Sequence, residues 1–352
     1  MRLYGLEAPD ADRGRSGRAP HASGSVRPPG NTGIIPQIMR IAILGSGGVG
    51  GYFGGRLAET GTDVAFIARG AHLAALRERG LRIDSPQGNH QVARVRATDD
   101  PATIGPVDIV FFTVKLYDTE EATRMLPPLI GPDTLVVPFQ NGVDSVEALT
   151  RAVGRTHVAG GTAYVAAVIA EPGLIRHTAM GSMIFGPLDG GRSPLLDRLV
   201  EACRHAGFGV TLSDRIMVDI WAKFVRLTVF SGMTALTRCP IGPLREDPDL
   251  RAMMQAALLE SIAVARAKGV PLPEKAFEDI DNAMGTLPPN AKSSMLEDLE
   301  RGRRLELPWL SGTVVRVGQE VGVDTPVHRF ITTALKPHVN GRPTNNTSKS
   351  ET

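Results

Sequence analysis

A short run near the start of the chain reads Ile41-Ala42-Ile43-Leu44-Gly45-Ser46-Gly47-Gly48-Val49-Gly50. Its apolar half predicts a buried strand, and its glycines follow the pattern G-x-G-x-x-G where a helix is expected to begin. In that pattern the first glycine permits a tight turn, the second lets the backbone approach a pyrophosphate, and the third lets the helix pack against the strand. We therefore predict a dinucleotide site whose cofactor-binding residues are Gly45, Ser46, Gly47, Gly48, Val49 and Gly50. A turn that is merely rich in glycine is the alternative.

Apolar runs alternate with helical stretches from residue 39 to about residue 211. The apolar runs are 41–44, 64–68, 109–114 and 135–137, and the helical stretches are 52–60, 71–79, 119–126 and 143–152. This alternation predicts βαβ units on a parallel sheet, which is an α/β, Rossmann-type architecture. Two further runs, 158–169 and 174–177, predict antiparallel strands added at the edge of that sheet.

The pattern changes to helices alone after about residue 212. Helical stretches are expected at 216–236, 248–267, 293–301 and 309–321. We predict a Rossmann-type dinucleotide-binding domain over residues 39–211 and an all-α substrate and catalytic domain over residues 212–338. Residues 1–38 and 339–352 are polar, so both ends are expected to be disordered, and Met39 is expected to be the natural first residue.

Composition and charge exclude several kinds of protein. The 352 residues are 42% hydrophobic, which allows two ordinary cores. A net charge of +2 argues against binding to nucleic acid. No apolar run reaches the roughly 18 residues of a membrane helix. Cys203 and Cys239 form no C-x-x-C pair, so we expect no disulfide framework and no metal site, and we predict a cytoplasmic protein whose partner is a small molecule.

The residue after the second predicted strand indicates which nicotinamide cofactor is bound, because that position reaches the adenosine ribose. It is Arg69, in Phe66-Ile67-Ala68-Arg69-Gly70. An acidic side chain there would bond the ribose diol, whereas a guanidinium forms charge-assisted hydrogen bonds with a 2′-phosphate. We therefore predict NADP(H) rather than NAD(H). The alternative is that Arg69 only caps a solvated loop.

Lysine is scarce in this chain, with seven residues against 32 arginines, so a lysine in apolar surroundings calls for a chemical explanation. Lys115 ends the apolar run 111–114, at the carboxyl edge where sheets of this class bind ligands. Lys223 lies in the apolar helical stretch 220–224. A buried ammonium has a lowered pKa, which suits a group that polarises a carbonyl and protonates it as hydride arrives. The alternative for Lys223 is an i, i+4 pair with Asp219 on a helix surface.

Three other polar motifs admit both a structural and a chemical explanation. Ser293 or Ser294 with Glu297 has the spacing of a capping box. Glu306, two residues before a proline, fits the first turn of a helix. Asn141-Gly142 fits a turn that follows a strand. The residues alone therefore leave the role of each motif open.

Together these motifs resemble the 2-dehydropantoate 2-reductase family, also called ketopantoate reductase, over about residues 39–338. The matching segments are the glycine run with Arg69, then VKLYDT at 114–119, QNGV at 140–143, WAK at 221–223, SSMLED at 293–298, and Glu306 ahead of LSG at 310–312. The resemblance implies two domains with both reactants held in a cleft between them. It also implies that Arg69 takes the 2′-phosphate of NADP(H).

The resemblance further implies roles for five residues. Lys223 would be the general acid on the keto oxygen, and Glu306 would assist it by hydrogen bonding. Lys115 and Asn141 would lie between the nicotinamide and the substrate and would contact both, and Ser294 would bind the substrate. The implied reaction passes a hydride from NADPH to the 2-keto carbon of ketopantoate, without a metal, and gives pantoate on the route to pantothenate and coenzyme A. A homodimer is possible.

Two positions depart from the family pattern, and both bear on the substrate. Leu227 and Ser311 stand where the family usually has asparagine. The loss of an amide that bonds a substrate changes discrimination by roughly 10²-fold or more, so a different 2-keto acid is an alternative substrate. A sensor that binds NADPH without turnover is the alternative from another class of protein.

Overall fold

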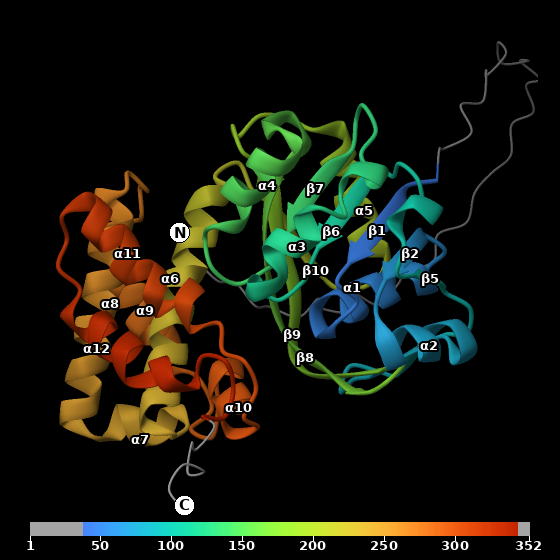
Figure 1. Ribbon diagram of the computed structural model, residues 1–352. Helices are drawn as coiled ribbons and strands as arrows, with labels where there is room; N and C mark the ends of the chain where they lie inside the picture. The colour runs from blue at the N-terminus through green and yellow to red at the C-terminus, as the bar shows by residue number, and fades with distance from the viewer. Residues whose placement is uncertain (1–37, 344–352) are drawn as a thin grey trace, which may run out of the picture. The chain divides into compact units, whose positions relative to one another are not determined.

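The computed structural model describes residues 38–343 (Figure 1). The predicted disorder of residues 1–37 and 344–352 therefore lies outside the described residues, as does the test of Met39 as the natural first residue. Within residues 38–343, no helix is both long and apolar enough to cross a membrane.

The first sheet is parallel and has five strands in the order β5-β2-β1-β6-β7. Its strands are β1 (Arg40–Leu44), β2 (Asp63–Ile67), β5 (Arg96–Thr98), β6 (Ile109–Phe112) and β7 (Leu135–Pro138). All the pairings between them are parallel. Helices α1 (Gly48–Glu59), α2 (Gly70–Arg79), α3 (Thr119–Thr123) and α4 (Ser145–Val153) alternate with the strands along the chain. This arrangement confirms the predicted α/β, Rossmann-type fold.

A second sheet is built around the long strand β9 (Leu174–Pro187), which pairs antiparallel with β8 (Ala159–Glu171). Along its other edge β9 pairs in parallel with β3 (Leu81–Asp84) and β10 (Gly209–Leu212), and β3 pairs with β4 (His90–Val92). The antiparallel pairing is as predicted, and Val158, just before β8, forms an isolated parallel bridge with Val136 in the edge strand β7. Strands β8 and β9 nevertheless belong to a second sheet rather than extending the first one. Because β9 has 14 residues, two short strands pair with different parts of it and complete a separate sheet.

Helix α1 lies between the two sheets, and its glycines make this packing possible. A Cβ at Gly54 would lie 2.8 Å from the Ile43 side chain of the first sheet. A Cβ at Gly55 would lie 2.7 Å from Ile83 of the second sheet. All residues from Gly50 to Leu57 are buried. The helix that begins at the glycine run is therefore held tightly on both sides.

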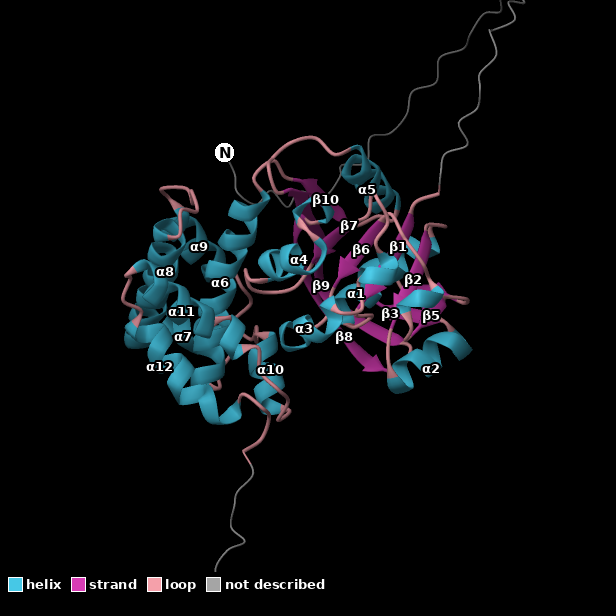
Figure 2. Cartoon of the chain, turned by 45° about the horizontal axis from the view of Figure 1, so that its top comes forward, coloured by secondary structure: helices cyan, strands magenta, loops and turns pink. Residues whose placement is uncertain are grey.

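The C-terminal part of the chain is helical (Figure 2), and α6 contributes several side chains to its apolar core. Its helices are α6 (Ile216–Thr237), α7 (Ile241–Glu246), α8 (Pro248–Ala267), α9 (Ala276–Gly285), α10 (Ser294–Glu300), α11 (Ser311–Val321) and α12 (Pro326–Leu335). Helix α5 (Pro194–His205) precedes β10 in the N-terminal part. Short 3-10 helices are η1 (Pro101–Thr103), η2 (Leu116–Asp118), η3 (Pro127–Leu129), η4 (Arg155–His157), η5 (Leu307–Trp309) and η6 (Lys336–His338).

The structure moves three of the predicted boundaries. The helical stretch predicted at 119–126 ends at Thr123, and the 3-10 helix η3 follows at Pro127. The predicted division after residue 211 falls inside β10. Residues 339–343 are expected to be disordered, but the structure describes them. The Leu305 amide donates to the Val339 carbonyl at 2.9 Å, and the backbone of Arg304 forms an isolated antiparallel β-bridge with that of Asn340. Pairing with the backbone of residues 304 and 305 therefore holds this segment in place, which its polar composition did not predict.

Candidate active site

The glycine run forms the turn between β1 and α1. Gly45 has a φ of +104°, and a Cβ there would lie 2.6 Å from the backbone nitrogen of Val114. Gly47 faces open space, with no atom within 4 Å of a Cβ placed on it. A Cβ at Gly50 would lie 2.6 Å from Ile43, so the helix packs directly on the strand. The turn thus has the sharp bend, the open approach and the close packing that a pyrophosphate site needs, and these residues fit a dinucleotide.

Gly48 has a constraint of its own that the motif does not explain. A Cβ at this position would lie 2.0 Å from the carbonyl oxygen of Ala167 in β8. Strand β8 of the second sheet therefore passes directly against the first turn of α1. Sequence reasoning missed this contact, because residues 48 and 167 lie far apart in the chain and Gly48 occupies a position that the motif leaves free.

Arg69 follows β2 and precedes α2, at the carboxyl edge of the first sheet. Its side chain is about half exposed, and Nη1 lies 2.8 Å from Oε1 of Glu121. The side chain makes no capping hydrogen bond to α2. A guanidinium carries five N–H donors in a planar fork, so one ion pair leaves donors that can face a phosphate.

Lys223 projects from α6 toward the sheet domain. Its Nζ donates to Oδ1 of Asn141 at 3.2 Å and to the carbonyl oxygen of Ala163 in β8 at 2.6 Å. Asp219 accepts instead from the hydroxyl of Ser213, so the pairing of Lys223 with Asp219 is not made within the described residues. Burial, helped by Arg226 and opposed by Glu306, lowers the pKa of Lys223 to about 7. The side chain of Lys223 can therefore release or take up a proton near neutral pH.

Asn141 joins this ammonium to a buried carboxylate. Its Nδ2 donates to Oε2 of Glu306 at 3.3 Å. The other carboxylate oxygen of Glu306 accepts from the Leu116 amide at 3.0 Å, and only 6% of the residue is exposed. The next residue, Gly142, has a φ of +85°, which turns the chain after Asn141. Asn141 and Glu306, 165 positions apart in the sequence, therefore belong to one hydrogen-bonded group with Lys223.

Lys115 also lies close to Glu306. Its Nζ is 3.2 Å from Oδ2 of Asp298 and 3.9 Å from Oε2 of Glu306. Burial alone would lower the pKa of Lys115, but Glu306 and Asp298 together raise it above the ordinary lysine value. The two lysines therefore differ: Lys115 is a fixed cation, and Lys223 can give up a proton near pH 7.

Ser294 occupies a different place from the residues that bond one another. It is the exposed first residue of α10. The capping serine is Ser293, whose hydroxyl accepts from the Leu296 amide at 3.0 Å and shares a hydrogen bond with Thr234 at 2.7 Å. Ser294 lies one helical turn before Asp298, the partner of Lys115. The structure brings Lys223, Asn141, Glu306 and Lys115 together. Within residues 38–343, none of the hydrogen bonds or ion pairs among these four side chains includes Ser294.

Sequence reasoning missed other polar residues at this site. Arg226 and Lys223 both lie against Tyr164, with the guanidinium carbon 5.3 Å and the ammonium 5.4 Å from the ring centroid. The i, i+3 spacing of the two cations on one helix was the available signal. Gln140 donates to the Val114 carbonyl at 2.9 Å and accepts from the Ser145 hydroxyl at 2.7 Å. Its signal was a polar residue directly after a buried strand.

This geometry defines a class of protein. A glycine turn shaped for a dinucleotide and a lysine with a pKa near 7 are the parts of a nicotinamide-dependent oxidoreductase. Comparison with known proteins gives the family. The model of ketopantoate reductase PanE/ApbA matches residues 41–190, and the model of its C-terminal part matches residues 215–339. The chain belongs to the ketopantoate reductase family, as its motifs predict, and members of this family are oxidoreductases that act on CH–OH groups.

Individual relatives align with this chain over nearly their whole length. A 2-dehydropantoate 2-reductase of Mesorhizobium japonicum is 33% identical over 82% of this chain and 94% of its own. An uncharacterized oxidoreductase of Bacillus subtilis, YkpB, is 31% identical over 82% of this chain and 95% of its own. The crystal structure of a PanE/ApbA family ketopantoate reductase from Ralstonia eutropha JMP134 has a TM-score of 0.78 at 34% identity, covering 86% of this chain and 98% of that one.

Proposed function

We propose that this protein reduces ketopantoate to pantoate with NADPH. The observation that carries the proposal is the position of Lys223, whose Nζ leaves the helical domain to bond Asn141 and the Ala163 carbonyl of the sheet domain. A lysine with a pKa of about 7 is a proton donor matched to neutral pH. On the outer surface of the molecule the same ammonium would have no chemical role.

The proposed mechanism assigns one task to each polar group. NADPH, when bound, supplies the hydride that reaches the 2-keto carbon. Lys223 stabilises the alkoxide that develops and protonates its oxygen. Asn141 orients the ammonium through Oδ1, and Glu306 favours its charged form. Lys115, held by Asp298, adds a positive charge beside the anionic reactants. Ser294 at the start of α10 is proposed to bind the substrate.

The preference for NADPH over NADH rests on Arg69. Its guanidinium lies at the carboxyl edge of β2, about half exposed and paired with Glu121. A 2′-phosphate brought to this edge would accept charge-assisted hydrogen bonds from the donors that Glu121 does not use. The glycine turn, Ser46 and Val49 would hold the rest of the dinucleotide at the N-terminus of α1.

The direct test is NADPH oxidation with ketopantoate, pyruvate and 2-ketoisovalerate. We expect the highest kcat/KM with ketopantoate. We expect Lys223→Ala to lower kcat by roughly 10²- to 10⁴-fold, because general acid catalysis contributes about that much, and to leave NADPH binding intact. Lys275→Ala, a change at an exposed lysine before α9, is the control. Turnover by Lys223→Ala equal to that of the control would remove the catalytic assignment.

A second candidate is the reduction of a different 2-keto acid on the same scaffold. Leu227, one turn after Lys223 on α6, is apolar and packs against the helical core. Ser311, the first residue of α11, is fully buried. Neither side chain supplies an amide to a substrate hydroxyl. A higher kcat/KM with pyruvate or 2-ketoisovalerate than with ketopantoate would favour this candidate.

The non-catalytic sensor is the least supported alternative, since a protein that only binds NADPH has no use for the bonded group of Lys223, Asn141 and Glu306. NADPH binding without oxidation of any of the three substrates would favour it. A cytoplasmic location and a homodimer are further proposals, which cell fractionation and light scattering of the purified protein would test.

A further inference from the structure

The loop between β7 and α4 lies along residues 306–316, which contain η5 and the first half of α11. Asn141 bonds Glu306 near the start of the contact. A Cβ on Gly142 would lie 3.2 Å from the carbonyl oxygen of Trp309. Asp144 then reaches residues of α11. We call these three successive contacts, of residues 141–144 with residues 306–316, the seam. Two of the proposed site residues, Asn141 and Glu306, thus face each other at one end of it.

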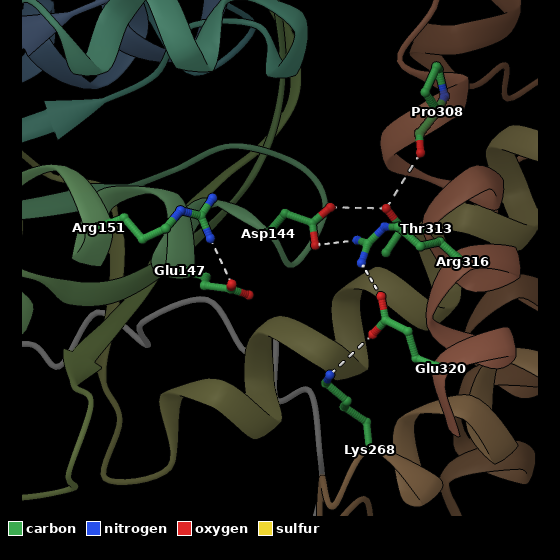
Figure 3. A network of polar contacts seen from close by, with 8 residues as sticks. All are labelled: Asp144, Glu147, Arg151, Lys268, Pro308, Thr313, Arg316 and Glu320. Carbon is green, nitrogen blue, oxygen red and sulfur yellow. Dashed lines mark hydrogen bonds and ion pairs between the residues drawn. The ribbon is translucent and has the colours of Figure 1, made fainter. Parts of the chain in front are cut away.

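Asp144 forms the other end of the seam (Figure 3). Its Oδ1 accepts from Nη2 of Arg316 at 2.7 Å, and its Oδ2 accepts from the Thr313 hydroxyl at 3.1 Å. Nη1 of Arg316 bonds Glu320 at 3.0 Å, and Glu320 also pairs with Lys268 at 3.4 Å. The guanidinium is therefore held between two carboxylates, and its direction toward Asp144 is fixed from both sides.

The sequence position of Asp144 makes this use of its carboxylate unusual. Asp144 is the N-cap residue of α4, yet its side chain makes no capping hydrogen bond. An aspartate at an N-cap ordinarily accepts from amides of its own helix and stabilises it. Here both carboxylate oxygens are used by α11 instead. The helix gives up a capping bond in favour of a contact with the segment that carries Glu306.

The loop is also fixed at its N-terminal end. Gln140 donates from Nε2 to the Val114 carbonyl at 2.9 Å and to the Thr119 hydroxyl at 3.0 Å. Its Oε1 accepts from the Ser145 hydroxyl at 2.7 Å. Asn141 therefore sits between two anchors, Gln140 and Asp144, and the positive φ of Gly142 provides the bend between them.

We propose that Asp144, held by Thr313 and Arg316, is the positioning group that sets Asn141 against Glu306 and Lys223. This inference rests on the proposed function, because it assumes that the bonded lysine is the proton donor. The bond from Asn141 to Glu306 is 3.3 Å long, near the limit for a hydrogen bond. A loop released at Asp144 could turn about Gly142 and lose that bond together with the one to Lys223.

The test compares Arg316→Gln and Asp144→Asn with Arg151→Gln. Arg151 pairs with Glu147 on the surface of α4 (Figure 3) and has no part in the seam. We expect kcat to fall roughly tenfold or more in the two seam variants, because small misplacements of a catalytic group cost up to about 10². The falling limb of the pH profile should move to lower pH, since Lys223 loses an acceptor that favours its charged form. The double variant Asp144→Arg/Arg316→Asp should recover part of kcat.

A second readout needs neither cofactor nor substrate. We expect amide hydrogen exchange in peptides covering 139–145 and 306–312 to become faster in the seam variants and to stay unchanged in Arg151→Gln. Half-exposed ion pairs contribute little to stability, so Tm should change little. If Arg316→Gln does not fold, Thr313→Val removes the other bond to Asp144 and is expected to show the same two effects.

Wild-type protein in the same assays separates the two proposals. An active wild type with unchanged kcat and unchanged exchange in the seam variants would overturn this inference and leave the proposed function standing. A loss of kcat in the seam variants no larger than the loss in Arg151→Gln would overturn this inference as well. A wild type that oxidises no NADPH with any 2-keto acid would overturn the proposed function, while faster exchange in the seam variants would still support the positioning role.

Discussion

At the scale of single residues, the two lysines of the site are pushed in opposite directions. Burial, helped by Arg226, brings the pKa of Lys223 down to about 7, whereas Asp298 and Glu306 outweigh burial and hold the pKa of Lys115 above its ordinary value. When the pKa values of two titratable groups in one site are shifted in opposite directions, the two groups commonly take different roles, one as the acid and the other in binding. Lys223 is suited to transfer a proton, and Lys115 is suited to stay charged beside an anion.

This difference predicts the pH dependence of the reduction. A proton donor must be protonated, so kcat for the reduction should fall as pH rises through about 7, by about tenfold per unit once Lys223 is mostly neutral. Lys115 should not titrate over the same range. The measurement is kcat at saturating NADPH and substrate from pH 5.5 to 9.5. A profile that stays flat to pH 9 would contradict the role of Lys223.

At the scale of the elements, α1 shows how two neighbouring glycines serve different purposes. Gly47 faces open space at the N-cap, whereas Gly48 faces the Ala167 carbonyl of β8. A methyl group at position 47 has room in the protein but enters the space that a pyrophosphate would use. A methyl group at position 48 meets backbone that cannot move away as a side chain can.

The pair Gly47→Ala and Gly48→Ala therefore separates binding from stability. We expect Gly48→Ala to lower the free energy of unfolding by about 1–3 kcal/mol, the usual cost of overpacking. Gly47→Ala should leave Tm nearly unchanged and raise KM for NADPH. Thermal unfolding and steady-state kinetics of the two variants make the comparison. Equal effects of both variants on Tm would show that the contact with β8 is not the constraint.

At the scale of the whole molecule, the sequence predicts the features that a few neighbouring residues encode. It does not predict the contacts between segments that lie far apart in the chain. The run 41–50 predicted a strand, a glycine turn and a helix because these features repeat over a few residues. The second sheet was missed because β3, β4 and β10 have only three or four residues each. Strands β3 and β10 pair with β9, and β4 pairs with β3. In the site, Lys223 and Glu306 were named from motifs. No local pattern encodes the bond of Asp144 to Arg316, which joins residues 172 positions apart.

The choice of cofactor can also be measured through the stability of the whole molecule. A ligand that binds only the folded state raises the free energy of unfolding of the protein. NADPH at 100 times its Kd should add about 2.7 kcal/mol, and NADH at the same concentration should add less. Arg69→Glu places an acid at the carboxyl edge of β2, where it would bond a ribose diol and repel a 2′-phosphate. The rise in Tm with NADPH should then shrink and the rise with NADH should grow. Arg79→Glu, the same charge change at the other end of α2, should keep the original order. If the ratio of the two shifts stays the same in Arg69→Glu, Arg69 does not select the cofactor, and its ion pair with Glu121 is then structural.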